Sequence, residues 1–69
     1  MPHADEPRFG NDLMTLAETA AYLRTPVATV RYWRHLGIGP AGFRLGRRVI
    51  YRRAEVDRWL CQRQATDGQ

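Results

Sequence analysis

The 69-residue chain contains no serine and no lysine, has a single cysteine, and has no long hydrophobic run. Without serine there can be no serine nucleophile. Cys61 cannot form an internal disulfide, and with His3 and His35 it cannot supply the four ligands of a structural zinc site. The apolar runs are too short to span a bilayer, and the acidic, proline-containing start is unlike a secretory signal or transit peptide. We therefore expect a cytoplasmic protein without a membrane segment, a disulfide or a metal.

All 11 basic residues are arginine, against 7 acidic residues, which gives a formal net charge of +4. Arginine without lysine is typical of GC-rich coding sequences. It predicts a high-GC bacterium or its phage as the source, and the bacterial cytoplasm or nucleoid as the location. A domain of this size buries only about 60% of the surface that its unfolded chain exposes, so there is little room for an enclosed pocket. We expect no enzymatic activity, no cofactor and no small-molecule ligand.

The charge is unevenly distributed along the chain. Residues 1–12 carry three acidic residues, one arginine and two prolines, a composition that predicts a disordered N-terminal arm. Residues 13–63 carry ten arginines and only three acidic residues. We expect one folded domain over residues 13–64 and a frayed C-terminal tail over residues 65–69. The folded part is therefore much more basic than the chain as a whole.

Two short helices are predicted at the start of the domain. Thr15 and Glu18 form a capping-box pattern, so a first helix should run from about residue 16 to residue 24. Thr25 is then the expected cap of a second helix over about residues 26–36, because Pro26 suits a first helical position. Gly37 is a typical helix end. Two short helices joined by a tight turn are typical of a helix-turn-helix.

Alternating apolar and polar residues over residues 43–52 predict a β-hairpin that turns near Gly46. A two-residue turn would mix arginines with apolar residues on each face. A three-residue turn instead pairs Leu45 with Val49 and Phe43 with Tyr51, and we therefore expect this odd-length turn.

A last helix is predicted over about residues 54–64. Val56, Trp59 and Leu60 recur at helical spacing, and acidic residues lie in the first turn, where they suit the helix dipole. This apolar stripe should close the core, with Trp33 and Trp59 as its largest side chains. The predicted fold class is mostly α with a small β-hairpin wing, a winged helix-turn-helix.

An exposed helix face beside an arginine-tipped hairpin predicts contact with double-stranded DNA. A helix fits the major groove, which is about 12 Å wide, and a basic hairpin beside it reaches phosphates or the adjacent minor groove. For the hairpin arginines, the alternative is a solvated turn. Arg34 is expected at the edge of the helix face, where an edge or phosphate role is more typical than base reading. The candidate DNA-binding residues are Thr29, Arg31, Tyr32 and His35 on the helix, and Arg44, Arg47, Arg48 and Arg52 on the hairpin.

Three segments carry a resemblance to a known family. They are T-V-R-Y-W over residues 29–33, G-P-A-G-F-R-L-G-R-R-V over residues 39–49, and V-D-R-W-L over residues 56–60. In this order they resemble the excisionase-type small DNA-binding domains, which are related to the winged-helix part of MerR-like regulators. The resemblance covers about residues 13–63. It implies that the second helix enters the major groove, and that Arg47 and Arg48 at the wing tip contact the backbone and the minor groove.

Members of this family act as recombination directionality factors or as small transcriptional regulators. The resemblance thus implies a phage or prophage excisionase that binds and bends attachment-site DNA and directs integrase-mediated recombination toward excision. Its partners would be double-stranded DNA, an integrase and neighbouring copies of itself. A small transcriptional regulator with the same docking mode is one alternative. A protein-interaction module whose basic face meets an acidic partner is another, and such a module should not show the steep salt dependence of duplex binding that phosphate contacts produce. The links between the predicted elements are short, which leaves open the exchange of a helix between two copies of the chain.

Overall fold

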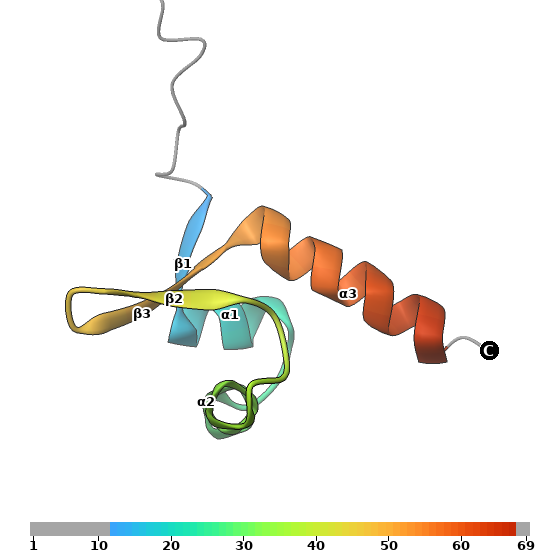
Figure 1. The fold of residues 1–69 in the computed structure, drawn as a ribbon, viewed down its shortest axis with the longest axis horizontal. Coiled ribbons are helices and arrows are strands. Elements are labelled where there is room, and N and C mark those ends of the chain that lie inside the picture. The colour runs from blue at the N-terminus through green and yellow to red at the C-terminus, as the bar shows by residue number, and fades with distance from the viewer. Residues whose placement is uncertain (1–11, 68–69) are drawn as a thin grey trace, which may run out of the picture.

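The computed structural model describes residues 12–67 as three helices and one three-stranded antiparallel sheet (Figure 1). The elements are β1 (Leu13–Thr15), α1 (Leu16–Tyr22), α2 (Val27–Leu36), β2 (Gly42–Leu45), β3 (Arg48–Arg52) and α3 (Arg53–Asp67). Strand β3 lies between β1 and β2. The predicted fold class is confirmed. Apart from Asp12, the predicted N-terminal arm lies outside the described residues.

The start of α1 has the predicted capping box. The Glu18 N–H donates to Thr15 Oγ1 over 3.0 Å, and the Thr15 N–H donates to Glu18 Oε1 over 2.9 Å. The three residues before α1 form strand β1, which the sequence pattern does not predict. Met14 in β1 pairs with Tyr51 in β3, so the entry to α1 is tied to the hairpin.

The turn between α1 and α2 differs from the predicted one. Helix α1 ends at Tyr22, and Arg24 takes a φ of 54°, the left-handed conformation that closes many helices. Thr25 does not cap α2, because its Oγ1 donates instead to the carbonyl oxygen of Leu23 over 3.0 Å. Pro26 occupies the cap position and makes no side-chain hydrogen bond there. The first N–H groups of α2 are therefore left without a capping side chain.

The hairpin turn has two residues, Gly46 and Arg47, so the predicted three-residue turn is wrong. Phe43 pairs with Ile50 rather than with Tyr51. Gly46 has a φ of 64°, and a positive φ at the first central position is what a type II′ turn requires. The conformation that glycine allows, rather than the matching of apolar residues, sets the register.

This register gives the sheet two different faces. Met14, Val49 and Tyr51 share the face that packs against the helices. Phe43 lies on the outer face, where it is 41% exposed. A shallow cavity of about 400 Å³ on this outer face is lined by Leu13, Phe43, Leu45 and Arg52. The apolar residues of the hairpin are thus divided between the two faces.

The core is centred on Tyr51, which is 1% exposed and is the largest fully buried side chain of the described residues. It is surrounded by the buried residues Met14, Ala20, Val30 and Val56. Trp33 and Trp59 are only half-buried, and their ring centroids lie 5.4 Å apart, which joins α2 to α3. The prediction that the two tryptophans are the largest core side chains is therefore wrong.

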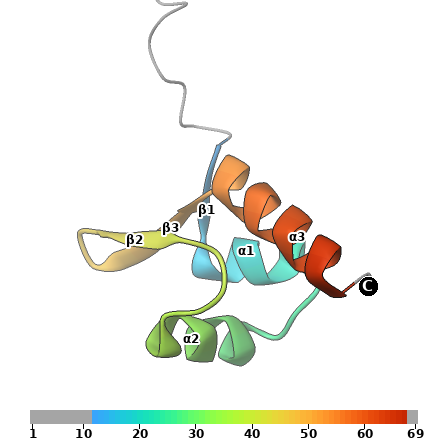
Figure 2. The ribbon, with the colours of Figure 1, turned by 45° about the vertical axis from the view of Figure 1, so that its right-hand side comes forward.

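Helix α3 is longer and less buried than predicted. It continues through Asp67, where the sequence predicts a frayed end from residue 65. Val56 is its one buried residue among those described, and residues 60–67 are all exposed. Figures 1 and 2 both show α3 extending away from the rest of the molecule. Its apolar stripe therefore closes the core only through its first turns.

The first turn of α3 is held to α1 by Tyr22. The Tyr22 hydroxyl donates to Asp57 Oδ1 over 2.5 Å, and the Arg53 guanidinium carbon lies 5.4 Å from the centroid of the Tyr22 ring. The hydrogen bond to Asp57, more than any other cause, raises the pKa of the Tyr22 hydroxyl above its usual value. These contacts fix where α3 leaves the body of the molecule.

Replacing Gly42 with alanine is expected to destabilise the fold by about 1–3 kcal/mol, because the added methyl group overpacks the core. A Cβ at position 42 would lie 2.7 Å from Cε2 of the buried Tyr51 ring. Urea unfolding of Gly42→Ala and of the wild type measures the difference. The destabilisation caused by Gly42→Ala should be smaller in a Tyr51→Leu background, where the ring is absent. An equal cost in both backgrounds would show that the clash is not the cause.

Candidate nucleic-acid interface

The exposed face of α2 contains three of its four predicted DNA-binding residues. Arg31, Tyr32 and His35 are exposed, whereas Thr29 is half-buried. Residues four apart share one face of a helix, so Thr29 lies on the same side as the half-buried Trp33. Thr29 is therefore at the edge of the exposed face and not at its centre.

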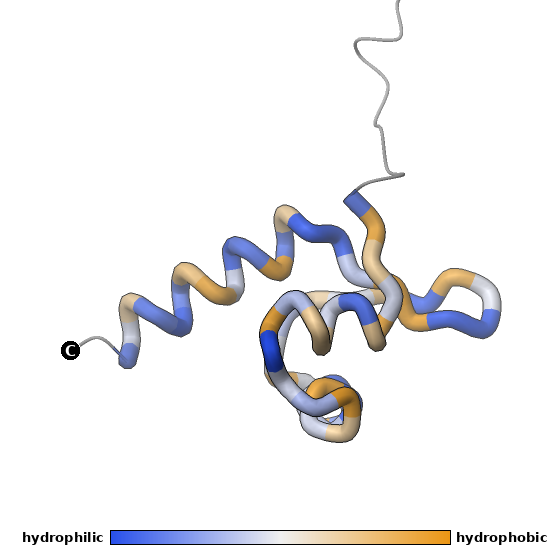
Figure 3. Tube along the Cα trace, turned by 180° about the vertical axis from the view of Figure 1, so that it is seen from behind, coloured by the Kyte–Doolittle hydropathy of each residue, from blue (hydrophilic) through white to orange (hydrophobic). Residues whose placement is uncertain are grey.

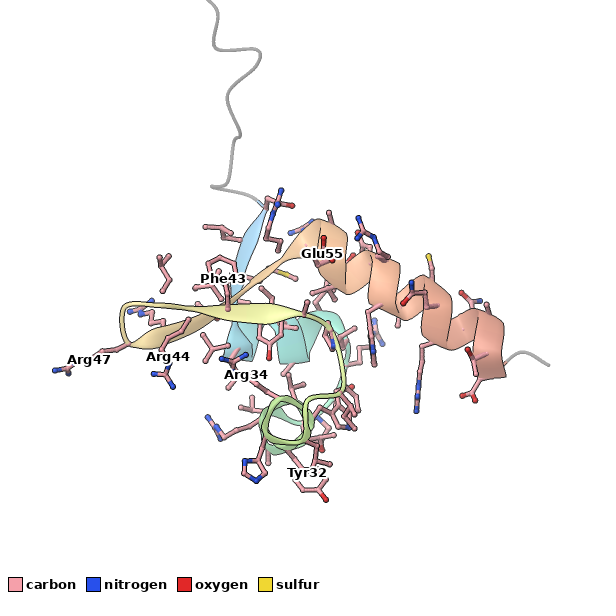
Figure 4. The ribbon with its side chains drawn as sticks, viewed as in Figure 1. Tyr32, Arg34, Phe43, Arg44, Arg47 and Glu55 are labelled. Carbon is pink, nitrogen blue, oxygen red and sulfur yellow. The ribbon has the colours of Figure 1, made fainter. Side chains whose placement is uncertain are left out.

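The basic residues of α2 gather on one side of the helix. Arg31, Arg34 and His35 are three and four positions apart, which makes them neighbours on a helical surface. In Figure 4, Arg34 lies between α2 and the hairpin, while Tyr32 points away from the hairpin. Arg34 therefore lies on the side of α2 that is next to the hairpin.

The arginines of the hairpin point in different directions. Arg44 pairs with Val49, so it lies on the helix-facing side of the sheet, and Figure 4 shows it in the space between the hairpin and α2. Arg47 extends from the turn itself, which is hydrophilic (Figures 3 and 4). Arg48 pairs with Leu45 and lies on the outer face. Of these three arginines, Arg44 is thus on the side of the hairpin that faces α2, Arg47 is at its tip and Arg48 is on the outer face.

Arg52 lies at the other end of β3 from the turn. Its Nε is 3.1 Å from Oδ2 of Asp12, and the side chain lines the outer cavity of the sheet. Arg52 is five positions along the chain from Arg47, which corresponds to about 16 Å of extended strand. The structure therefore does not bring Arg52 together with the other candidate residues.

The chain from α2 through the hairpin is free of negative side chains. No acidic residue occurs between Glu18 and Glu55, a stretch that contains eight arginines. Within residues 12–67, Arg31, Arg44, Arg47 and Arg48 form no ion pair. Unpaired arginines on adjacent elements produce a positive potential that attracts a polyanion.

The described part of the chain contains no metal site, no membrane-spanning helix and no disulfide. Among residues 12–67, no three His, Cys, Asp or Glu side chains are grouped so that they could hold a metal ion. None of the helices described there is long and apolar enough to cross a bilayer. Cys61 is exposed on α3 and forms no disulfide.

The short pair of helices α1 and α2, followed by the β2–β3 hairpin, is the arrangement of a small winged helix-turn-helix, a class of DNA-binding domain. The family model of a helix-turn-helix domain matches residues 13–64, and the chain belongs to this family. No curated protein and no solved structure matches the chain significantly. Membership of the family supports sequence-specific binding of double-stranded DNA.

Proposed function

We propose that this protein is a DNA-binding factor of the excisionase type, which binds and bends attachment-site DNA so that an integrase excises rather than inserts its element. The observation that carries the proposal is the continuous basic segment between Glu18 and Glu55, which holds both α2 and the hairpin and has no acidic side chain. The helix-turn-helix family supports the DNA-binding part. The resemblance of residues 29–33, 39–49 and 56–60 to excisionase-type domains supports the role in recombination.

In the proposed complex, α2 lies in the major groove and the hairpin follows the adjacent backbone or minor groove. Base edges would be read from the exposed face of α2 by Arg31, Tyr32 and His35, with Thr29 at its edge. Phosphates would be contacted by Arg44, Arg47 and Arg48. Arg52 is left out of this interface because it is paired with Asp12 on the outer face of the sheet.

One winged helix covers only a few base pairs, so useful specificity needs additional protein on the same DNA. We propose that neighbouring copies of this chain, or its integrase, supply the additional contacts. The protein should therefore bind an isolated site weakly, and several copies should bind adjacent sites cooperatively.

The affinity for duplex DNA is expected to depend steeply on salt. If about six phosphates are contacted, the plot of log affinity against log salt concentration should have a slope near −5, because each contact releases condensed counterions. Fluorescence anisotropy with a labelled duplex over about 50–200 mM salt measures this slope. A flat response would favour the protein-interaction module over the DNA-binding proposal.

The role in recombination is tested separately from DNA binding. An excisionase should bend a duplex that carries its attachment site and stimulate excision by the integrase in a purified reaction. A transcriptional regulator with the same fold should occupy promoter DNA and change transcript levels, without any effect on excision. Duplex binding without bending or stimulation would leave the regulator as the better description.

A further inference from the structure

The loop between α2 and β2 borders an open cavity that the proposed function does not use. The cavity has a volume of about 280 Å³ and is lined by Arg34 and by every residue from 37 to 42. It lies where the chain passes from α2 to the hairpin, between the two elements of the proposed interface. A ligand held there would touch both elements.

Arg34 brings a partly buried positive charge with little compensation to this cavity. Its guanidinium Nη1 donates to the carbonyl oxygen of Gly42 at 3.5 Å, which is long for a hydrogen bond. No carboxylate pairs with Arg34 within residues 12–67. Burial raises the pKa of the neighbouring Tyr51 hydroxyl, and the charge of Arg34 acts in the opposite direction. A partly desolvated guanidinium without a carboxylate is suited to binding an anion.

Two residues of the loop that line the cavity have backbone N–H groups without a partner among the described residues. Gly39 and Ala41 line the cavity, and neither donates its N–H to another group in the described part of the chain. Gly39 has a φ of 84°, and a Cβ there would lie 3.0 Å from Cβ of Trp33, so this part of the loop lies tightly against α2. Residues with unpaired backbone N–H groups therefore share the cavity lining with the Arg34 guanidinium, and such groups are donors that a phosphate can use.

We propose that this cavity binds one backbone phosphate of the duplex, with Arg34 as its principal ligand. The inference rests on the proposed DNA binding and adds a positioning contact that fixes how α2 sits in the groove. Arg44 extends into the same space between the hairpin and α2 (Figure 4). A DNA strand that passes between the two elements would therefore meet both arginines.

The test compares two variants that each remove one positive charge, Arg34→Gln and Arg63→Gln. Arg63 is exposed on α3, away from the cavity, and serves as the control. Arg34→Gln should bind a duplex selected by the wild type from a random pool about tenfold more weakly, because a charge-assisted hydrogen bond is lost. The magnitude of its salt slope should fall by about one. Arg63→Gln should change neither quantity.

Arg34→Lys separates charge from geometry. It keeps the charge but not the planar fork, so it should keep the wild-type salt slope while losing part of the affinity. If Arg34→Gln does not fold, the affinity and salt slope of Arg34→Lys test the proposal instead. In addition, single neutral methylphosphonates placed along the duplex should identify one phosphate whose neutralisation weakens binding of the wild type but not of an Arg34 variant.

The outcomes distinguish this inference from the proposed function. If the wild type binds no duplex, both fail. If the wild type binds with a steep salt slope but Arg34→Gln behaves like Arg63→Gln, only the phosphate contact is overturned. A titration with inorganic phosphate tests whether the cavity binds free phosphate instead of a phosphate of the duplex. Saturable shifts of the Gly39 and Ala41 amide signals, together with unchanged DNA binding by Arg34→Gln, would assign the cavity to free phosphate and overturn the inference.

Discussion

Truncation of Tyr51 to alanine is expected to leave the protein largely unfolded at room temperature. Tyr51 is 1% exposed and contacts the centre of the core between the sheet and the helices. Loss of a buried aromatic side chain costs about 3–5 kcal/mol. The total stability of so small a domain is only about 5 kcal/mol. Urea unfolding followed by tryptophan fluorescence and far-UV circular dichroism measures the loss.

Tyr51→Phe is the matched control for this prediction. It keeps the ring that fills the core beside Gly42, so it should retain most of the stability of the wild type. Trp59→Ala provides a second comparison. Trp59 is half-buried, so its truncation should lower the free energy of unfolding less than Tyr51→Ala does, although tryptophan is the larger side chain. A loss for Tyr51→Ala that is smaller than the loss for Trp59→Ala would contradict the placement of the core at Tyr51.

Replacement of Arg31 or Tyr32 with alanine is expected to change which DNA site the protein prefers, whereas Arg47→Ala should weaken binding to all sites about equally. Side chains on the exposed face of α2 would read base edges, and each good base contact contributes about 1–3 kcal/mol of discrimination. A hairpin arginine would contact phosphates, which are the same at every sequence. Affinities for a selected site and for single-base variants of that site measure the two effects.

The same measurements on Arg48→Ala test whether the outer face of the hairpin takes part. If the DNA backbone reaches that face, Arg48→Ala should also weaken binding to all sites about equally. The four substituted residues are all exposed, so the alanine variants should keep native far-UV spectra and nearly native stability. These residues are Arg31, Tyr32, Arg47 and Arg48. A uniform loss of affinity from Arg31→Ala would contradict the division between reading by α2 and anchoring by the hairpin.

Those parts of the fold that depend on local chemistry could be predicted from the sequence. The capping box at Thr15 and the helix end at Gly37 are both present, because side chains and backbone within a few residues determine them. The helix face with Arg31 and His35 follows from helical spacing alone. Strand β1 could not be predicted, because its three residues are too few to show alternation and its partner lies far along the chain.

The predicted three-residue turn is wrong because the apolar residues of the hairpin do not share one buried face. The two-residue turn at Gly46 places Phe43 outside and Tyr51 inside. For the same reason the sequence could not show that Arg44 and Arg48 lie on opposite faces of the sheet. It also could not show that Arg52 is paired with Asp12. The positions of these arginines depend on strand pairing, which the turn geometry determines.

The projecting second half of α3 makes the local stability of the molecule uneven. An isolated helix of this length is marginal in water, and residues 60–67 are not buried against any other element. This end can therefore open and close without disturbing the core around Tyr51. Backbone amides should exchange with solvent fastest there, so the last turns of α3 report on fraying while the strands report on global unfolding.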